Sequence, residues 1–292
     1  MRLLTLAAGA LVAATLAAPA PAQAARDKVW TKSWPVTAAP TVRIVTNDAR
    51  VRIHRGAPDS VTARIHFAAK AWGMSHNIED PRVVLEQDGN VIRVEAREGN
   101  NWVVFGGIET KFEMDVTVPA NCDLSARSGD GSITCEPLEG RISLESGDGR
   151  IHASGLKGTI VLWSGDGGVD ADSLDGSLMA HTGDGHLKVS GRFDNLDLRT
   201  GDGRLEASAL AGSRTAGPWS LETGDGSLQL RIPRNLQALL DASARDGSLH
   251  VDLPVSTKGA IRNNSLYGEL NGGNVPLRLR SGDGSITLGL SE

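Results

Sequence analysis

A short motif, Ser/Thr-Gly-Asp-Gly, recurs along the second half of the chain and restricts the folds that the chain can adopt. Its aspartates are Asp130, Asp148, Asp166, Asp184, Asp202, Asp225, Asp246 and Asp283, with Asp246 in a degenerate Ala-Arg-Asp-Gly copy. Its glycines are Gly129, Gly131, Gly147, Gly149, Gly165, Gly167, Gly183, Gly185, Gly201, Gly203, Gly224, Gly226, Gly247, Gly282 and Gly284. The first five aspartates are 18 residues apart, and the later gaps are 23, 21 and 37 residues. A fixed period near 20 residues predicts a solenoid of stacked repeats.

The residues that follow each motif alternate between apolar and polar side chains. Two positions after the last glycine, the copies have Ile133, Ile151, Val169, Leu187, Leu205, Leu228, Leu249 and Ile286. The next position is almost always polar, as in His152, Asp170, Lys188, Glu206 and Gln229. The residues before each motif alternate in the same way. Period-two alternation is typical of a strand with one face inward, so each repeat supplies two short strands.

Stacked repeats place each strand beside its copy in the next coil, about 4.8 Å away, where backbone groups find partners. We therefore predict an all-β fold, a parallel β-solenoid or flattened β-helix. Its coils have about 18 residues and two short strands each. The inward aliphatic residues form continuous columns that no single coil buries alone, so stability belongs to the stack. A thin core of this kind agrees with an aromatic content of only 4%.

The motif itself is predicted to be a structural turn. We expect its glycines to supply backbone conformations with positive φ at no steric cost. We expect the aspartate and the Ser/Thr hydroxyl to accept hydrogen bonds from nearby turn amides.

Four regions follow from the sequence. Residues 1–24 have a positive start, an apolar run from Leu3 to Ala18 and a small-residue cleavage site, which predict a signal peptide cut after Ala24. Residues 25–40 are interpreted as an N-terminal extension and residues 41–120 as irregular capping coils. Residues 121–290 form the regular repeat, with a loop insertion near 254–275. No later apolar run reaches the length of a membrane span, so we predict an exported mature chain in the periplasm, at the outer surface or outside the cell.

The cysteine count and the charge narrow the choice further. Cys122 and Cys135 are the only cysteines, and an even count in an exported chain favours a possible disulfide between them. The formal net charge is −5 with both signs interspersed, which argues against a nucleic-acid partner.

The repeated pattern [ST]-G-D-G-x-[IVL]-x-[VAL], the irregular strands before it and Leu270-Asn271-Gly272-Gly273 before the last motif resemble the bacterial "putative adhesin" family. That family is a β-strand-repeat domain of unknown function in envelope and secreted proteins. The resemblance implies a β-solenoid at the cell envelope. It carries over no catalytic or binding residue.

Three functions are open at this point. The first is a non-enzymatic, adhesin-like binding or structural protein of the envelope, without a cofactor, whose partner is a surface polysaccharide or another envelope protein. The second is a calcium-stabilised repeat protein, since stacked aspartates repel one another unless a cation offsets them. Its ligands would be Asp130, Asp148, Asp166, Asp184 and Asp202. The third is a carbohydrate-active enzyme, although regularly spaced carboxylates indicate structure more than one catalytic site.

Overall fold

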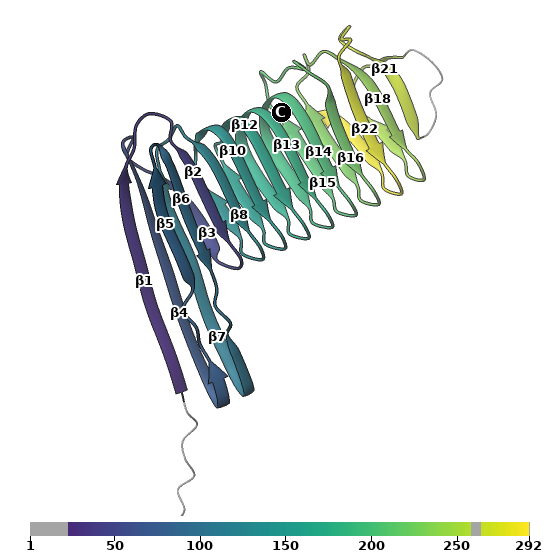
Figure 1. The fold of residues 1–292 in the computed structure, drawn as a ribbon. Coiled ribbons are helices and arrows are strands. Elements are labelled where there is room, and N and C mark those ends of the chain that lie inside the picture. Colours follow the sequence, from purple (N-terminus) through teal and green to yellow (C-terminus); the bar gives the residue numbers. More distant parts are fainter. Residues whose placement is uncertain (1–22, 258–263, 292) are drawn as a thin grey trace, which may run out of the picture.

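The computed structural model describes residues 23–257 and 264–291, and all secondary structure in these ranges is β-strand. Two rows of strands face each other along an elongated stack (Figure 1). We call them the first row, whose strands precede the turns, and the second row, whose strands follow them.

The first row begins and ends with antiparallel pairs and is parallel in between. In spatial order it contains β5 (Arg82–Asp88), β6 (Val91–Arg97), β2 (Thr41–Thr46), β8 (Asp123–Ser128), β10 (Glu139–Ser146), β12 (Lys157–Ser164), the second halves of β13 (Val169–Thr182) and β14 (Leu187–Thr200), β16 (Trp219–Thr223), β22 (Pro276–Ser281), β18 (Ala238–Ala244), β21 (Ser265–Leu270) and β20 (Ser256–Thr257).

The second row begins with two antiparallel pairs and is then parallel. In spatial order it contains β1 (Gln23–Pro35), β4 (Ser60–Asn77), β7 (Trp102–Val118), β3 (Arg50–Arg55), β9 (Ile133–Cys135), β11 (Ile151–Ser154), the first halves of β13 and β14, β15 (Leu205–Ala209), β17 (Leu228–Ile232), β23 (Ile286–Leu290) and β19 (Leu249–Val251).

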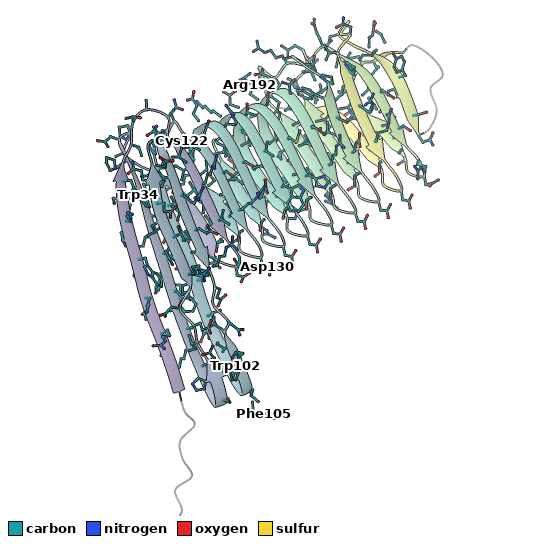
Figure 2. All side chains as sticks on the ribbon, viewed as in Figure 1. Trp34, Trp102, Phe105, Cys122, Asp130 and Arg192 are labelled. Carbon is teal, nitrogen blue, oxygen red and sulfur yellow. The ribbon has the colours of Figure 1, made fainter. Side chains whose placement is uncertain are left out.

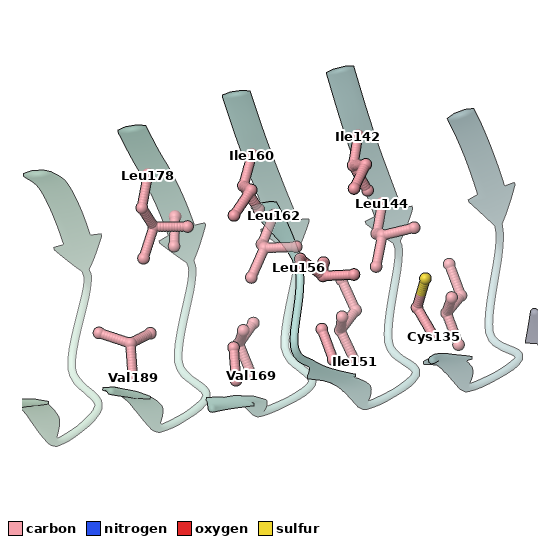
Figure 3. Packing of buried hydrophobic residues seen from close by; sticks show 14 of the residues in the cluster. Cys135, Ile142, Leu144, Ile151, Leu156, Ile160, Leu162, Val169, Leu178 and Val189 are labelled. Carbon is pink, nitrogen blue, oxygen red and sulfur yellow. The ribbon is translucent and has the colours of Figure 1, made fainter. Parts of the chain in front are cut away.

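The core lies between the two rows, where the predicted aliphatic columns are confirmed. Ile133 pairs with Ile151, Ile151 with Val169, and Val169 with Leu187, each in parallel register. All four side chains are fully buried. Figure 3 shows this packing around Ile151 and Val169, with Ile142, Leu144, Ile160 and Leu162 on the facing strands. The fold is all-β and solenoid-like.

At both ends, the order of the coils in space differs from their order in the chain. The coil of β2 and β3 lies between the later strands β6 and β7 on one side and β8 and β9 on the other. Near the C-terminus, the final coil of β22 and β23 is inserted between the coil of β16 and β17 and that of β18 and β19. The last coil in the chain is therefore the next to last in space.

The regions predicted at the two ends take a different form in the structure. Most of the predicted extension 25–40 belongs to β1, an edge strand that pairs with β4 along its whole length. Within the predicted loop near 254–275, Ser265–Leu270 is a strand, β21, which pairs antiparallel with β18 and covers the end of the first row. The predicted signal peptide lies almost entirely outside the described residues, as do residues 258–263.

Strands β1, β4 and β7 form a three-stranded projection, which we call the blade. Strand β3 pairs only with the last six residues of β7. The rest of β7 and its antiparallel partner β4 therefore extend beyond the stack. The blade extends on the side of the turns (Figure 1). Within the described residues, we find no helix that is long and apolar enough to cross a membrane.

Candidate functional site

The predicted turn residues form one continuous ridge along the edge of the stack. All eight aspartates of the motif are exposed on this ridge, and Figure 2 labels Asp130 at its end near the blade. The structure thus places Asp130, Asp148, Asp166, Asp184 and Asp202 in one row. Among the described residues, however, no group of three or more His, Cys, Asp or Glu side chains is arranged to hold a metal ion.

The glycines of the motif do not have the positive φ that we expected. Among described glycines, positive φ occurs elsewhere, for example at Gly140, Gly158 and Gly176 in the looser turns at the other edge. The motif glycines are instead required by lack of space. A Cβ on Gly149 would lie 2.4 Å from the carbonyl oxygen of Gly131, and one on Gly167 would lie 2.2 Å from that of Gly149.

The Ser/Thr hydroxyl of the motif also differs from the expected role, because it mainly donates to the neighbouring coil. Ser164 Oγ donates to the Gly149 carbonyl at 3.1 Å, and Thr182 Oγ1 donates to the Gly167 carbonyl at 2.9 Å. Both side chains are fully buried. The expected acceptance from a turn amide does occur at Ser146, whose Oγ accepts from Gly149 N at 3.1 Å. The hydroxyls therefore link successive turns.

The structure holds Cys122 and Cys135 as free, buried thiols rather than as a disulfide. Burial raises the pKa of the Cys122 thiol to about 11, with a further contribution from Asp123. Burial also raises the pKa of the Cys135 thiol, as do the nearby Cys122 and Glu136. Both thiols behave as small core side chains.

A concave surface lies on the outer face of the second row, away from the core. This polar groove has a volume of about 650 Å³. Its lining side chains come from β11, β13, β14, β15 and β17 and include His152, Asp170, Asp172, Lys188, Ser190, Glu206, Ser208, Gln229 and Arg231.

Two adjacent columns of side chains give the groove its shape. The strand register places His152, Asp170, Lys188, Glu206 and Gln229 beside one another in one column. The neighbouring column contains the shorter Ser190 and Ser208 and ends at Arg231. Long side chains therefore border short ones, and the face is hollowed between them.

The acidic side chains of the groove are already held by neighbouring groups. Asp170 Oδ1 lies 3.2 Å from His186 Nε2. Asp172 Oδ1 accepts hydrogen bonds from the hydroxyls of Ser154 at 3.0 Å and Ser173 at 2.9 Å. Glu206 Oε1 lies 3.4 Å from Arg204 Nη1.

The cationic and amide groups of the groove are differently placed. Within the described part of the chain, the side chains of Lys188, Gln229 and Arg231 have no hydrogen bond or ion pair. Lys188 and Arg231 are exposed. The groove therefore presents unpaired donors, while its carboxylates are engaged.

A family model, Toastrack DUF4097, matches residues 41–289. The chain belongs to the Toastrack DUF4097 family. No curated protein matches the chain.

Solved structures similar to this Toastrack chain are only 10–12% identical to it in sequence. A "putative adhesin" from Parabacteroides merdae is 11% identical, with a TM-score of 0.49, over 89% of this chain and 96% of its own. A "putative lipid binding protein" from Parabacteroides distasonis is 10% identical, with a TM-score of 0.47, over the same shares. A "putative cell adhesion protein" from Clostridium sporogenes is 12% identical, with a TM-score of 0.30, over 90% of this chain and 100% of its own.

A second hollow of the Toastrack fold, about 510 Å³ in volume, lies where the ridge meets the blade. Asp48, Glu98 and Asp130 line it together with Arg50 and Lys111. Burial, and then the charge of Asp130, raises the pKa of Asp48. Burial and, to a smaller extent, Asp48 raise the pKa of Glu98, opposed by a hydrogen bond from Asn101. Because cations stand beside these acids, the hollow has mixed charge.

The sequence does not predict the polar groove, although the repeat pattern includes the residues of its first column, from His152 to Gln229. In the repeat pattern these residues indicate only that one face of the strand is polar. The sequence does contain a signal for the groove, namely which residue each coil has at this position, because in-register stacking brings equivalent positions of successive coils side by side. The second column, with Ser190 and Ser208, lies outside the repeat pattern and provides no such signal.

Proposed function

We propose that this protein is an exported, non-enzymatic binding protein of the cell envelope, and that its polar groove binds an acidic surface polysaccharide. The observation that supports this most is the set of unpaired donors, Lys188, Gln229 and Arg231, in a groove that crosses several parallel strands. Export is supported by the leader-like sequence of residues 1–24.

A polymer suits this surface better than a small molecule. The groove is open along its length, and the stack repeats its polar groups about every 4.8 Å. Small-molecule sites are usually concave, mostly apolar and enclosing. No exposed aromatic side chain lines the groove, so recognition would rest on hydrogen bonds and charge. Two cationic donors beside engaged carboxylates favour a polymer with anionic groups.

Binding is also a better match than hydrolysis. Glycoside hydrolysis needs two carboxyl groups that face each other across the scissile bond. Here Asp170, Asp172 and Glu206 project from one face, and each is held by a neighbouring side chain. The groove has no opposing wall that would set an acid and a base on two sides of a sugar.

Titration of the purified mature chain against acidic and neutral bacterial polysaccharides, at fixed ionic strength, tests this function. We expect measurable affinity for acidic polymers that falls as salt is raised. The double variant Lys188→Ala, Arg231→Ala should lose about tenfold or more in affinity, since charge-assisted hydrogen bonds are the strong ones.

The matched control is Arg199→Ala, Arg245→Ala, which removes one cation from the outer face of the first row and one from the turn that follows β18. This control should bind like the wild type. Equal weakening by both double variants would show that only overall charge matters, and the groove would then be excluded as the site. Absence of binding to every polysaccharide, with capture of an envelope protein through the same groove, would contradict the choice of polymer.

A further inference from the structure

We propose that the far end of the blade inserts into the surface of a lipid bilayer. Four large apolar side chains are exposed there, and we call them the apolar tip: Trp72, Trp102, Val104 and Phe105. Their exposed fractions are 46%, 42%, 46% and 82%. They come from the paired strands β4 and β7 in the part of the blade away from the stack, where Figure 2 labels Phe105 at the far end and Trp102 nearer the stack.

The backbone of the tip holds these side chains outward. The paired strands bend where Gly73 has φ 141° and Phe105 has φ 55°. A Cβ on Gly106 would lie 1.8 Å from the Trp72 carbonyl oxygen, and one on Gly107 would lie 2.2 Å from the Trp72 ring. Glycine is therefore required on β7 beside Trp72, so that the two strands can approach and the indole can lie across them.

Phe105 is the least expected residue at this bend. A bulky side chain with positive φ is a strained and uncommon choice, whereas Gly, Asn or Asp adopts that conformation more easily. Its ring makes little contribution to the core, because it is more than four-fifths exposed. Folding does not explain a phenylalanine at this position, but contact with an apolar phase outside the protein does.

The place where the chain enters the blade indicates that this phase is a membrane. The first described residue, Gln23, is the cross-strand partner of Trp72. The predicted cut after Ala24 therefore leaves the N-terminus of the mature chain beside the tip, because Ala25 pairs with Lys70. Signal peptides are removed at the membrane that the chain crosses, so this end of the mature chain is released at a bilayer surface. Tryptophan is also the side chain enriched at membrane interfaces, because its ring is amphipathic.

A second copy of the chain is a weaker explanation for the same surface. Stable protein interfaces bury about 1,200–2,000 Å² in total, and four exposed side chains at a narrow end offer far less. The surroundings carry both signs of charge, since Lys70 is paired in register with Glu109 and Arg26 is followed by Asp27. We therefore expect insertion to depend on apolar burial more than on anionic lipid.

Vesicle binding by the exported, processed chain tests this proposal. The chain is mixed with vesicles of phosphatidylcholine, or of phosphatidylcholine with phosphatidylglycerol, and bound protein is measured by co-sedimentation. Quenching of tryptophan fluorescence by brominated lipid reports depth. The test variant is Trp102→Gln, Phe105→Asn, in which asparagine tolerates positive φ. The matched control is Trp163→Gln, because Trp163 is 43% exposed on the outer face of β12, away from the blade.

We expect the wild type and the control to bind both kinds of vesicle with quenching, and the tip variant to bind at least about tenfold more weakly. The proposal is overturned if the wild type binds neither vesicle, or if the tip variant binds as well as the wild type. It is equally overturned if the chain dimerises through the tip without binding vesicles. Polysaccharide affinity is measured on the same variants and should not change, so the groove and the tip are tested independently.

Discussion

At the scale of single residues, the turn glycines are fixed by the distance between coils rather than by their own φ. Successive turns approach so closely that the carbonyl of one coil occupies the place of a side chain in the next, as at Gly149 and Gly167. The turn at the start of the repeat supports this reading. It has Asn47 and Ala49 where later copies have glycine. The strands on its far side, β6 and β7, are not joined by such a turn, so no equivalent turn approaches these two residues from that side.

Substitution of one turn glycine tests this explanation directly. In Gly167→Ala, the new methyl group would meet the Gly149 carbonyl oxygen at 2.2 Å. We expect the free energy of unfolding to fall by about 1–3 kcal/mol, the usual range for overpacking, as measured by urea denaturation. Gly289→Ala is the control, because nothing lies within 4 Å of its Cβ position. Similar stability of the two variants would refute the close-packing explanation.

At the scale of the elements, the sequence predicted the coils well and their order poorly. Period-two alternation, repeated at a fixed spacing, encodes which side chains point inward, so columns such as Ile133, Ile151 and Val169 were predictable. The motif does not encode which coil lies beside which, because the copy at Ser281–Gly284 matches those in the middle of the stack. The one available signal was the degenerate copy at Asp246, since terminal repeats are usually atypical.

The inserted final coil makes a specific prediction about truncation. A chain that ends after residue 273 loses β22 and β23, which lie between β16 and β18 in one row and between β17 and β19 in the other. We expect such a chain to lose solubility or cooperative unfolding. The coil of β16 and β17 and the coil of β18 and β19 would both lose the parallel strands with which they pair.

The measurement is the yield of soluble protein together with thermal unfolding followed by circular dichroism. If the coils were stacked in chain order, removal of the last one would only shorten the stack, with a proportionate loss of stability. A soluble, cooperatively folded truncated chain with a slightly lower melting temperature would therefore contradict the observed strand order.

At the scale of the whole molecule, one rigid stack carries three separate surfaces. The polar groove lies on the outer face of the second row, the aspartate ridge follows the turn edge, and the apolar tip lies beyond that edge at the end of the blade. Sequence reasoning found the ridge because its residues repeat. It missed the tip because Trp72 and Phe105 are distant in sequence and meet only through the long antiparallel pairing of β4 and β7.

The ridge gives the molecule a global electrostatic property that separates simple repulsion from calcium binding. Its carboxylates are exposed and repeat about every 4.8 Å, so neighbouring charges repel by roughly 1 kcal/mol in water at low salt. The Debye length falls from about 10 Å at 0.1 M salt to about 3 Å at 1 M. Sodium chloride should therefore raise the melting temperature by a few degrees. The variant Asp148→Asn, Asp166→Asn, Asp184→Asn should melt higher at low salt and respond less to added salt.

Since no described group of ligands is arranged for a metal, calcium should stabilise the fold no more than magnesium at equal ionic strength, and a chelator should leave the melting temperature unchanged. A midpoint that rises with micromolar calcium alone, and falls in the asparagine variant, would restore the calcium-stabilised alternative.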